Sequence, residues 1–381
     1  MTPTPVTFVS PTAPAAYQWE ATNDEVAARY GVPVERIIRF DLNTSPAPPE
    51  LASRVLAGGR FETTLSEYPP SDYRRLVEAA AGVYRVAPEN LLVGAGADEI
   101  LDLAAKTFLP STGAAVVPVP TYAMYHVLTS QRGARSIAVP RLGPAADWAL
   151  DAEAVRAAAR EAEVVWLCSP NNPTGRSEPP GAIEALLADL ATDAAAAGRE
   201  VPAVVLDEAY AEIAGHTLIP LVERYPNLVV VRTASKAYAL AGLRVGFAIA
   251  RAETIGRMAP YRPPGSVATT SVTVVTEALL DGSAMRANVA RIELERGALR
   301  EALTEAGWTV GGSETNFVVA DFGTPERAAT VAEGLLRRGL VPRTFGAGHL
   351  FARCLRLTVR DAAGNDRLVA AARDLATEGV R

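Results

Sequence analysis

Of the 37 lysines and arginines in the chain, only two are lysines, Lys106 and Lys236. A coding bias toward arginine explains such a ratio on the surface, and it leaves lysine mainly where arginine cannot replace it. Imine formation with an aldehyde is one such place, because a guanidinium is never a usable amine nucleophile. Lys106 lies in a helical pattern typical of a surface lysine, so Lys236 is the candidate for chemistry.

Hydroxyl and guanidinium groups flank Lys236 in the segment TASKAYALAGLR, residues 233–244. Thr233 and Ser235 lie beside the lysine, and Arg244 follows it. Together they can hold a phosphate dianion while the lysine amine reaches an aldehyde at the other end of the same ligand. The alternative is a helix start capped by Ser235, which explains the serine but not a lone lysine among apolar residues.

Further polar residues follow two apolar runs. Asp207 ends VPAVVLD, with Tyr210 three residues later, and Asn172 lies in SPNNPTG after EVVWLC. A carboxylate at a sheet edge stays ionised only when it is paired, and a pyridinium nitrogen is a suitable partner. Tyr210 can reach the same ligand, and Asn172 can donate to a phenolate oxygen. A helix-capping aspartate and ordinary turn chemistry are the alternatives.

The segment LLVGAGADEIL places Gly94 and Gly96 between a strand and a helix. Free N–H groups at such a helix start suit a phosphate, although a tight turn alone explains the glycines. Each of these pieces has a structural alternative. Their joint order, at strand edges of one sheet, has no comparable alternative.

Seven β-type runs alternate with helical patterns from Leu91 to about residue 262. They predict strands over 91–96, 114–120, 135–140, 163–170, 201–209, 227–234 and 244–250, with helices over 98–109 and 181–198. Nearly continuous apolar strands separated by helices predict an α/β fold, in which a mostly parallel sheet is covered by helices on both faces.

The C-terminal part predicts a smaller α/β domain. Helical patterns over 266–282 and 285–307 precede a strand–helix–strand–helix tail over 313–322, 325–339, 354–359 and 365–375. A chain of 381 residues is expected to form two closely joined domains. The predicted organisation is an N-terminal arm over 1–50, which joins the small domain and a dimer contact and holds one short helix over 23–30. A large domain over 51–264 and a small C-terminal domain over 265–381 follow.

Bulk properties exclude several classes of function. The net charge of −6 argues against nucleic acid as a partner. Residues 1–16 are proline-rich and make a poor secretory signal, and no stretch reaches the ~18–20 apolar residues that span a bilayer. Cys168 and Cys354 cannot form a disulfide framework, and the three histidines lack metal-ligand spacing. We therefore expect a cytoplasmic protein with no membrane segment and no metal site.

The motifs, in this order, resemble the fold-type I aminotransferases that depend on pyridoxal 5'-phosphate (PLP), and specifically their histidinol-phosphate aminotransferase branch. The resemblance covers nearly the whole chain and is most specific in RTASKAYALAGLRVG. Supporting matches are YPPSDY, GAGADE, PTYAMY, SPNNPTG, DEAYAE, SETNFVV and CLRLTV. It implies the PLP-dependent transferase fold type I.

The resemblance also implies a role for each matching residue. Lys236 would bind the cofactor covalently and shuttle a proton, and Asp207 would pair with the pyridinium nitrogen. The remaining implied cofactor contacts are Asn172 and Tyr210 at the phenolic oxygen, Tyr122 on the ring face, and the backbone of Ala97 and Asp98 with Thr233, Ser235 and Arg244 at the phosphate. Tyr68 would reach the phosphate in the neighbouring subunit, which implies a homodimer.

On the substrate side, the resemblance implies that Arg356 binds the carboxylate of glutamate or 2-oxoglutarate and the phosphate of a phosphorylated substrate. Arg343 would assist with that phosphate, and Tyr17 and Asn43 would lie in the substrate pocket. For Arg343 and Tyr17 a solvated or packing role is the alternative. The implied reaction is a ping-pong transfer from an amino donor to a 2-oxo acid acceptor.

One motif departs from the family pattern. The usual Asn-Glu-Asn-Pro is Asn43-Thr44-Ser45-Pro46 here, and Arg360 is closer to the related threonine-phosphate decarboxylases. Histidinol phosphate with 2-oxoglutarate is the first prediction, which implies histidine biosynthesis. The alternatives are an aminotransferase for aromatic or other amino acids and, third, a phospho-amino-acid decarboxylase. A PLP-binding transcription regulator is excluded, because the arm is too short for a DNA-binding module.

Overall fold

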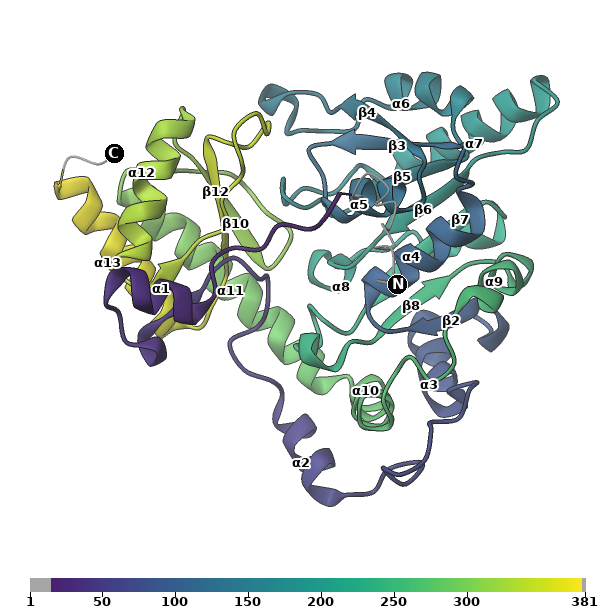
Figure 1. The fold of residues 1–381 in the computed structure, drawn as a ribbon, viewed down its shortest axis with the longest axis horizontal. Helices are drawn as coiled ribbons and strands as arrows, with labels where there is room; N and C mark the ends of the chain where they lie inside the picture. Colours follow the sequence, from purple (N-terminus) through teal and green to yellow (C-terminus); the bar gives the residue numbers. More distant parts are fainter. Residues whose placement is uncertain (1–14, 379–381) are drawn as a thin grey trace, which may run out of the picture.

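The fold is organised around one seven-stranded sheet in a computed structural model, which describes residues 15–378 (Figure 1). In the order β2-β8-β7-β6-β5-β3-β4, the strands are β2 (Leu91–Gly94), β8 (Gly246–Ile249), β7 (Leu228–Thr233), β6 (Ala203–Asp207), β5 (Val164–Cys168), β3 (Ala114–Val119) and β4 (Arg135–Pro140). Strand β8 is antiparallel to β2 and β7, and the other neighbours are parallel. The seven predicted strands are all present, and the predicted fold class is confirmed.

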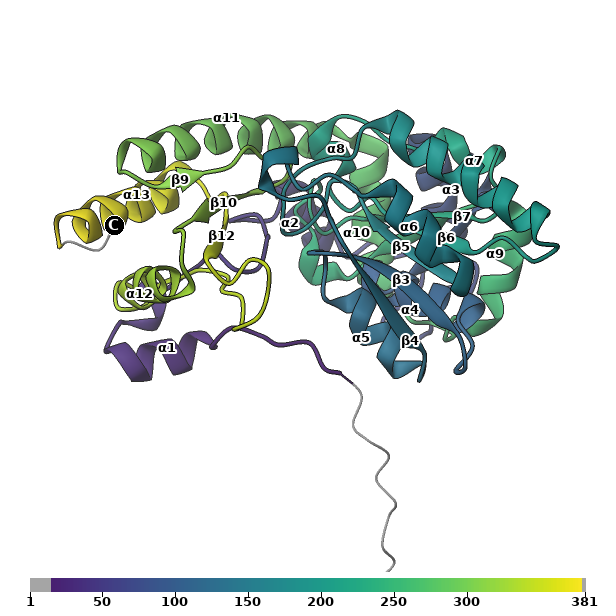
Figure 2. The ribbon, with the colours of Figure 1, turned by 90° about the horizontal axis from the view of Figure 1, so that it is seen from above.

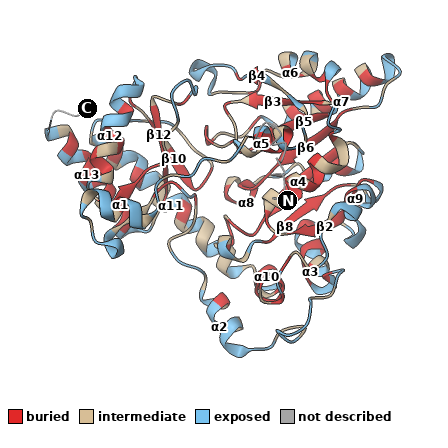
Figure 3. Cartoon of the chain, viewed as in Figure 1, coloured by how far each residue is buried: buried red, intermediate tan, exposed pale blue. Residues whose placement is uncertain are grey.

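Both faces of this sheet are buried except at its edge strand β4, as its uninterrupted apolar strands predict. In β5, Val165 and Leu167 pack into one apolar cluster, and Val164 and Trp166 pack into the other. One cluster is covered by α3 (Arg74–Tyr84), α6 (Ala152–Ala158) and α7 (Pro180–Ala196), and the other by α4 (Ala97–Phe108), α5 (Met124–Gln131) and α9 (Ala252–Met258). Figure 3 shows the strands inside this edge mostly in red, as a buried layer.

A second, smaller sheet lies in the C-terminal part. It has the order β12-β10-β9, with β12 (Cys354–Thr358), β10 (Phe317–Asp321) and β9 (Thr309–Val310) all antiparallel. Its helices are α11 (Ser283–Glu305), α12 (Pro325–Leu336) and α13 (Ala362–Thr377). Their apolar residues form a third core, into which Phe40 from the N-terminal arm is fully buried. The smaller α/β unit is therefore completed by a segment from the other end of the chain.

The N-terminal arm links the two sheets. Its helix α1 (Asn23–Tyr30) lies where the sequence predicts it and begins with a capping box between Thr22 and Glu25. Strand β1 (Ile38–Arg39) then pairs with β11 (Leu340–Val341). In the other direction the chain crosses to α5, where the Ala15 amide donates to Ser130 Oγ at 3.2 Å (Figure 2). The prediction for the proline-rich start falls largely on residues 1–14, which lie outside the described part.

Three further helices complete the architecture: α2 (Glu50–Gly58), α8 (Ala211–Ala214) and α10 (Thr269–Asp281). The valines of α10 pack in the core of the large sheet, close to α2 and α3. The domain limits at residues 50 and 264 stay predictions. Within residues 15–378 no helix is long and apolar enough to cross a membrane, and no group of three potential metal-ligating side chains occurs.

Candidate functional site

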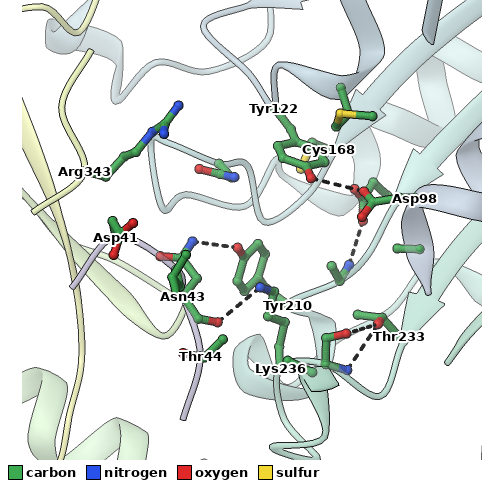
Figure 4. Close-up of a pocket in the computed structure, with 18 of the residues that line it drawn as sticks. Asp41, Asn43, Thr44, Asp98, Tyr122, Cys168, Tyr210, Thr233, Lys236 and Arg343 are labelled. Carbon is green, nitrogen blue, oxygen red and sulfur yellow. Dashed lines mark hydrogen bonds between the residues drawn. The ribbon is translucent and has the colours of Figure 1, made fainter. Parts of the chain in front are cut away.

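A cavity of about 600 Å³ opens at the carboxyl ends of β5, β6 and β7, facing the smaller sheet (Figure 4). Fourteen of the fifteen predicted site residues line it: Tyr17, Asn43, Ala97, Asp98, Tyr122, Asn172, Asp207, Tyr210, Thr233, Ser235, Lys236, Arg244, Arg343 and Arg356. Ligands bind at this edge in open α/β sheets. The exception is Tyr68, whose side chain is 90% exposed and lies outside the cavity.

Lys236 lies in the turn that follows β7, where no helix begins, so the alternative of a Ser235 helix cap does not apply. Its Nζ donates to the Asn43 carbonyl at 3.1 Å, and no carboxylate of the described chain forms an ion pair with it. Burial lowers the pKa of Lys236 to about 8, and the nearby charge of Arg356 acts in the same direction. The amine is therefore accessible in its neutral, nucleophilic form near neutral pH. Lys106 instead pairs with Asp102 at 2.5 Å on α4.

Asp207 is the last residue of β6 and is buried at the floor of the cavity. It accepts hydrogen bonds from Tyr125 Oη at 2.8 Å and from the Ala209 amide at 3.0 Å. Burial raises the pKa of Asp207 to about 6 despite these two bonds. Helix α8 is capped at Tyr210, so Asp207 is not a helix cap. A cationic group of a ligand would stabilise the ionised carboxylate.

The start of α4 and the turn after β7 form a cradle for an anion. The amides of Ala97 and Asp98 belong to the first turn of α4, where helix geometry leaves N–H groups without intrahelical acceptors. Facing them, Thr233 Oγ1 donates to Ser235 Oγ at 2.9 Å, and an Arg244 nitrogen lies 3.2 Å from Asp98 Oδ2. These donors, with the positive end of the helix dipole, suit a phosphate.

Two glycines allow this close approach. Gly96 has φ of +85°, and a Cβ on it would lie 2.5 Å from an Arg244 nitrogen. A Cβ on Gly246 would meet the backbone of Gly96 and lie 2.6 Å from the Ala97 nitrogen. The glycines of GAGADE and LRVG are therefore required by packing of the backbone around the cradle, which goes beyond the tight turn that the sequence alone suggests.

Polar side chains from both sheets meet above Lys236. Asn43 Nδ2 donates to Tyr210 Oη at 2.9 Å, and Arg356 donates to Asn172 Oδ1 at 2.6 Å. Burial raises the pKa of Tyr210, which keeps its hydroxyl protonated. Tyr122 Oη donates to Asp98 Oδ1 at 3.1 Å. The ring, hydroxyl and amide groups thus line one continuous surface between the anion cradle and the arginines.

Arg356 lies in β12, and its side chain is almost fully buried. It donates to the Asp41 carbonyl as well as to Asn172, its Nε has no hydrogen-bond partner, and no carboxylate within residues 15–378 pairs with it. Burial lowers the pKa of Arg356, and the charge of Arg343 acts in the same direction. A buried guanidinium without a counter-ion is suited to bind an anionic ligand.

Several residues that line the cavity or contact its lining carry no individual prediction from the sequence. Tyr125 holds Asp207, Asn316 Nδ2 donates to the Asn43 carbonyl at 2.9 Å, and Trp19 packs on Tyr17. The motifs PTYAMY and SETNFVV contain the first two, so the signal was present without an assigned role. Glu20, on the arm, lies outside all the motifs quoted above.

The departing segment also has a defined environment. Thr44 lines the cavity, whereas Ser45 points to α11, where Asn288 donates to its Oγ at 3.2 Å. Arg360 donates to the Thr44 carbonyl at 3.0 Å and does not line the cavity. The similarity of Arg360 to the decarboxylases therefore has no counterpart in a direct contact with the cavity.

Comparisons with known proteins agree with this geometry. Residues 50–372 match the family model described as aminotransferase class I and II. The histidinol-phosphate aminotransferase of Thermococcus gammatolerans is 34% identical over 89% of this chain and 92% of its own length. That of Roseiflexus castenholzii is 33% identical over 93% of each chain. A crystal structure of the histidinol-phosphate aminotransferase from Sinorhizobium meliloti, in complex with pyridoxal-5'-phosphate, superposes with a TM-score of 0.84 at 25% identity, covering 94% of this chain and 96% of that one.

Proposed function

This chain belongs to the class I and II aminotransferase family, whose members depend on PLP, and from that premise we propose that it transfers the amino group of histidinol phosphate to 2-oxoglutarate. The reaction would be ping-pong, with the amino donor leaving as an oxo product before the 2-oxo acid enters. The observation that carries the proposal is the buried Arg356, which has no ion-pair partner among residues 15–378, in a chain about one-third identical to named histidinol-phosphate aminotransferases.

The chemistry of the cavity fits PLP. The amides of Ala97 and Asp98, with the Thr233, Ser235 and Arg244 side chains, would hold its phosphate. Asn172 and Tyr210 would hold its phenolic oxygen, Tyr122 would lie against its ring, and Asp207 would pair with its ring nitrogen. When bound, the cofactor supplies an aldehyde for the amine and an electron sink for the bond at the substrate Cα.

Two side chains of this protein would move or hold protons. Lys236 Nζ, with a pKa of about 8, can both accept a proton from the substrate Cα and return it. Asp207 would keep the ring nitrogen protonated, because ionisation of this buried carboxyl becomes favourable beside a cation. Tyr125 and the Ala209 amide orient that carboxylate. The protein thus sets the protonation states and leaves bond polarisation to the cofactor.

Arg356 would bind the anionic group next to the reacting carbon. In the acceptor this group is a carboxylate, and in histidinol phosphate it is a phosphate, and a guanidinium binds either anion in a bidentate way. Arg343 would add a second positive charge, and Tyr17 and Asn43 would line the remaining pocket. One arginine would therefore serve both half-reactions.

Tyr68 supports the proposal of a homodimer. Its hydroxyl does not reach the cavity of its own chain, and its exposed ring lies against Gly265. A partner subunit would bring Tyr68 to the phosphate cradle. Co-expression tests this directly, because a dimer of one Lys236→Ala subunit and one Tyr68→Ala subunit should recover one intact site. If the mixed protein is no more active than the single variants, the shared site is wrong.

A second candidate substrate class is favoured by a neighbouring cavity of about 590 Å³. Its lining includes aromatic side chains from the arm, from the turn before α5 and from the loop before β12, namely Tyr17, Trp19, Tyr122 and Phe345. Aromatic side chains bind flat rings through stacked or edge-on contacts. This observation supports aromatic amino acids as alternative donors.

Absorbance spectra of the half-reaction test these proposals. The PLP form of the purified enzyme is mixed with histidinol phosphate, phenylalanine, glutamate or threonine phosphate, and conversion to pyridoxamine phosphate is followed. Histidinol phosphate and glutamate should both convert it. If only phenylalanine and glutamate react, the aromatic alternative replaces the proposal, and carbon dioxide release from threonine phosphate would favour the decarboxylase.

A further inference from the structure

Glu20 is an acidic residue in a pocket otherwise suited to anions. It lies on the arm between Trp19 and α1, and it lines the second cavity together with Arg343 and Arg356. Among the described residues that line this cavity, Glu20 is the one carboxylate. A negative charge beside two arginines changes how many anionic groups the pocket can accept.

Three contacts hold Glu20 in place. Its Oε1 accepts hydrogen bonds from the Thr344 amide at 2.8 Å and from Thr344 Oγ1 at 2.9 Å. The same oxygen lies 3.7 Å from an Arg343 nitrogen. Both charged side chains are more than four-fifths buried, at 17% and 19% exposure, so solvent screens the pair less than a surface ion pair. These contacts therefore hold the Glu20 carboxylate next to Arg343.

Arg343 is held between the arm and the cavity. One of its nitrogens donates to the Gln18 carbonyl at 2.9 Å, and its guanidinium lies over the Tyr17 ring. Figure 4 shows its side chain extending into the cavity. The backbones of Arg343 and Arg356 pair as an antiparallel bridge, so directly opposed side chains leave on the same side. The two arginines are thus neighbours, but Glu20 pairs with one of them.

The other carboxylate near the arginines is already neutralised. Asp41 lies in a two-pronged ion pair with Arg39, at 2.8 Å from Nε and 2.5 Å from the second nitrogen. Arg356 donates to the backbone carbonyl of Asp41 and not to its carboxylate. Of the two arginines at the substrate end, Arg343 is therefore compensated by Glu20, whereas Arg356 has no ion-pair partner among the described residues.

We propose that Glu20 sets the charge that the substrate pocket accepts. By pairing with Arg343 it weakens the binding of a second anionic group on the substrate, and it leaves Arg356 as the main site for a single carboxylate or phosphate. This inference deepens the proposed function, since it concerns the same pocket. Glu20 would be a specificity-determining residue that acts through Arg343.

Glu20→Gln separates this role from a purely mechanical one. The amide oxygen can still accept both hydrogen bonds from Thr344, whereas the negative charge beside Arg343 is lost. Asp24→Asn is the matched control, because Asp24 is exposed on the same arm and removes an equal charge without touching Arg343.

Calorimetric titration of the holoenzyme with two unreactive ligands measures the effect. Glutarate carries two carboxylates, and pentanoate carries one on a chain of the same length. Glu20→Gln should lower the dissociation constant for glutarate roughly tenfold, because the charge of Arg343 is then no longer compensated and can bind the second carboxylate. The dissociation constant for pentanoate should stay within about twofold. Asp24→Asn should change neither. In an Arg343→Gln background the Glu20→Gln effect should disappear.

Equal changes for both ligands, or no change for either, would overturn the proposal, because Glu20 would then act as a fastener of the arm or have no role. Neither ligand is an amino donor. The outcome is therefore independent of whether histidinol phosphate reacts, and a failed half-reaction would not be mistaken for a failure of this inference.

Discussion

The wall of the cavity that carries Lys236 and Asp207 comes from one sheet, whereas the opposite wall comes from segments far apart in the chain. The sheet wall consists of residues within a few positions of a strand end: Thr233, Ser235, Lys236, Asp207 and Asn172. The opposite wall consists of Tyr17, Trp19, Asn43, Arg343 and Arg356 from the arm and the smaller sheet. Glu20 lines the neighbouring cavity and pairs with Arg343 of this wall.

The two walls also differ in how they are held. A core of buried apolar residues on both faces of the sheet fixes the strand ends of the first wall. On the second wall, hydrogen bonds between the arm and other segments carry much of the position, such as those from Thr344 to Glu20. The departing residues Thr44 and Ser45 follow directly after Asn43 of the second wall. The difference teaches that, under the proposed function, the chemistry would rest on the wall that the apolar core fixes, and the substrate preference on the wall that the arm helps to build.

The largest effect is expected at Lys236. Replacing it by alanine should reduce transamination by roughly 10⁴-fold or more, since both the amine nucleophile and the proton carrier are lost. Peptide mapping after borohydride reduction should find the cofactor label at Lys236 in the unmodified sequence. Lys106→Ala is the control, because Lys106 pairs with Asp102 on α4 and should leave activity unchanged. A label at another residue would show that Lys236 does not bind the cofactor covalently.

Asp207→Asn should lower activity by roughly 10²- to 10³-fold, because the ring nitrogen would lose its charged partner. Stability without cofactor should change in the opposite sense. The folded-state pKa of Asp207 is raised from 3.8 to about 6. The buried negative charge therefore lowers the free energy of unfolding fully above pH 6 and has no effect below pH 4.

At pH 7.5 the Asp207→Asn protein should accordingly unfold at a higher denaturant concentration than the unmodified protein. Its free energy of unfolding should be larger by at most about 3 kcal/mol. The two should converge near pH 4. Urea titrations of cofactor-free protein at both pH values measure this difference. A variant that is less stable at pH 7.5 would mean that the Tyr125 and Ala209 hydrogen bonds outweigh the burial of charge.

The contrast between the walls also explains what could be predicted from sequence. Apolar runs such as VPAVVLD define the strands, and parallel strands bring their carboxyl ends to one edge, so the position of Asp207 and its neighbours follows from local patterns. The helix over 23–30 follows from its capping signals. Short pairs such as β1 with β11 lack any local signal, because residues 38 and 340 meet only through the tertiary fold. For the same reason the sequence around Glu20 does not predict its pairing with Arg343. The roles of the cavity residues stay predictions.

An intermediate effect is expected at Arg356, on the second wall. Arg356→Lys cannot reproduce the donation to both Asn172 and the Asp41 carbonyl while binding a carboxylate in a two-pronged way. The KM for 2-oxoglutarate should rise roughly 10- to 100-fold, whereas the absorbance spectrum of the bound cofactor stays the same. Arg353→Lys, at a residue that pairs with Asp321 outside the cavity, is the control. An altered spectrum without a change in KM would assign Arg356 to the cofactor.

The smallest effect is expected where the two walls touch, at Asn288 of α11. Its Nδ2 donates to the Ala237 carbonyl at 2.8 Å and to Ser45 Oγ at 3.2 Å, so one amide joins the lysine turn to the departing segment. Asn288→Ala should lower kcat a few-fold and the free energy of unfolding by about 1 kcal/mol, since one carbonyl loses its partner. Ser45→Ala should do less, and the double variant should resemble Asn288→Ala alone, because both changes remove the same link. Glu301→Ala on the exposed part of the same helix provides the baseline. Strictly additive losses would show that the segment at 44–45 is independent of the lysine turn, and the two walls would then be held in place without this link between them.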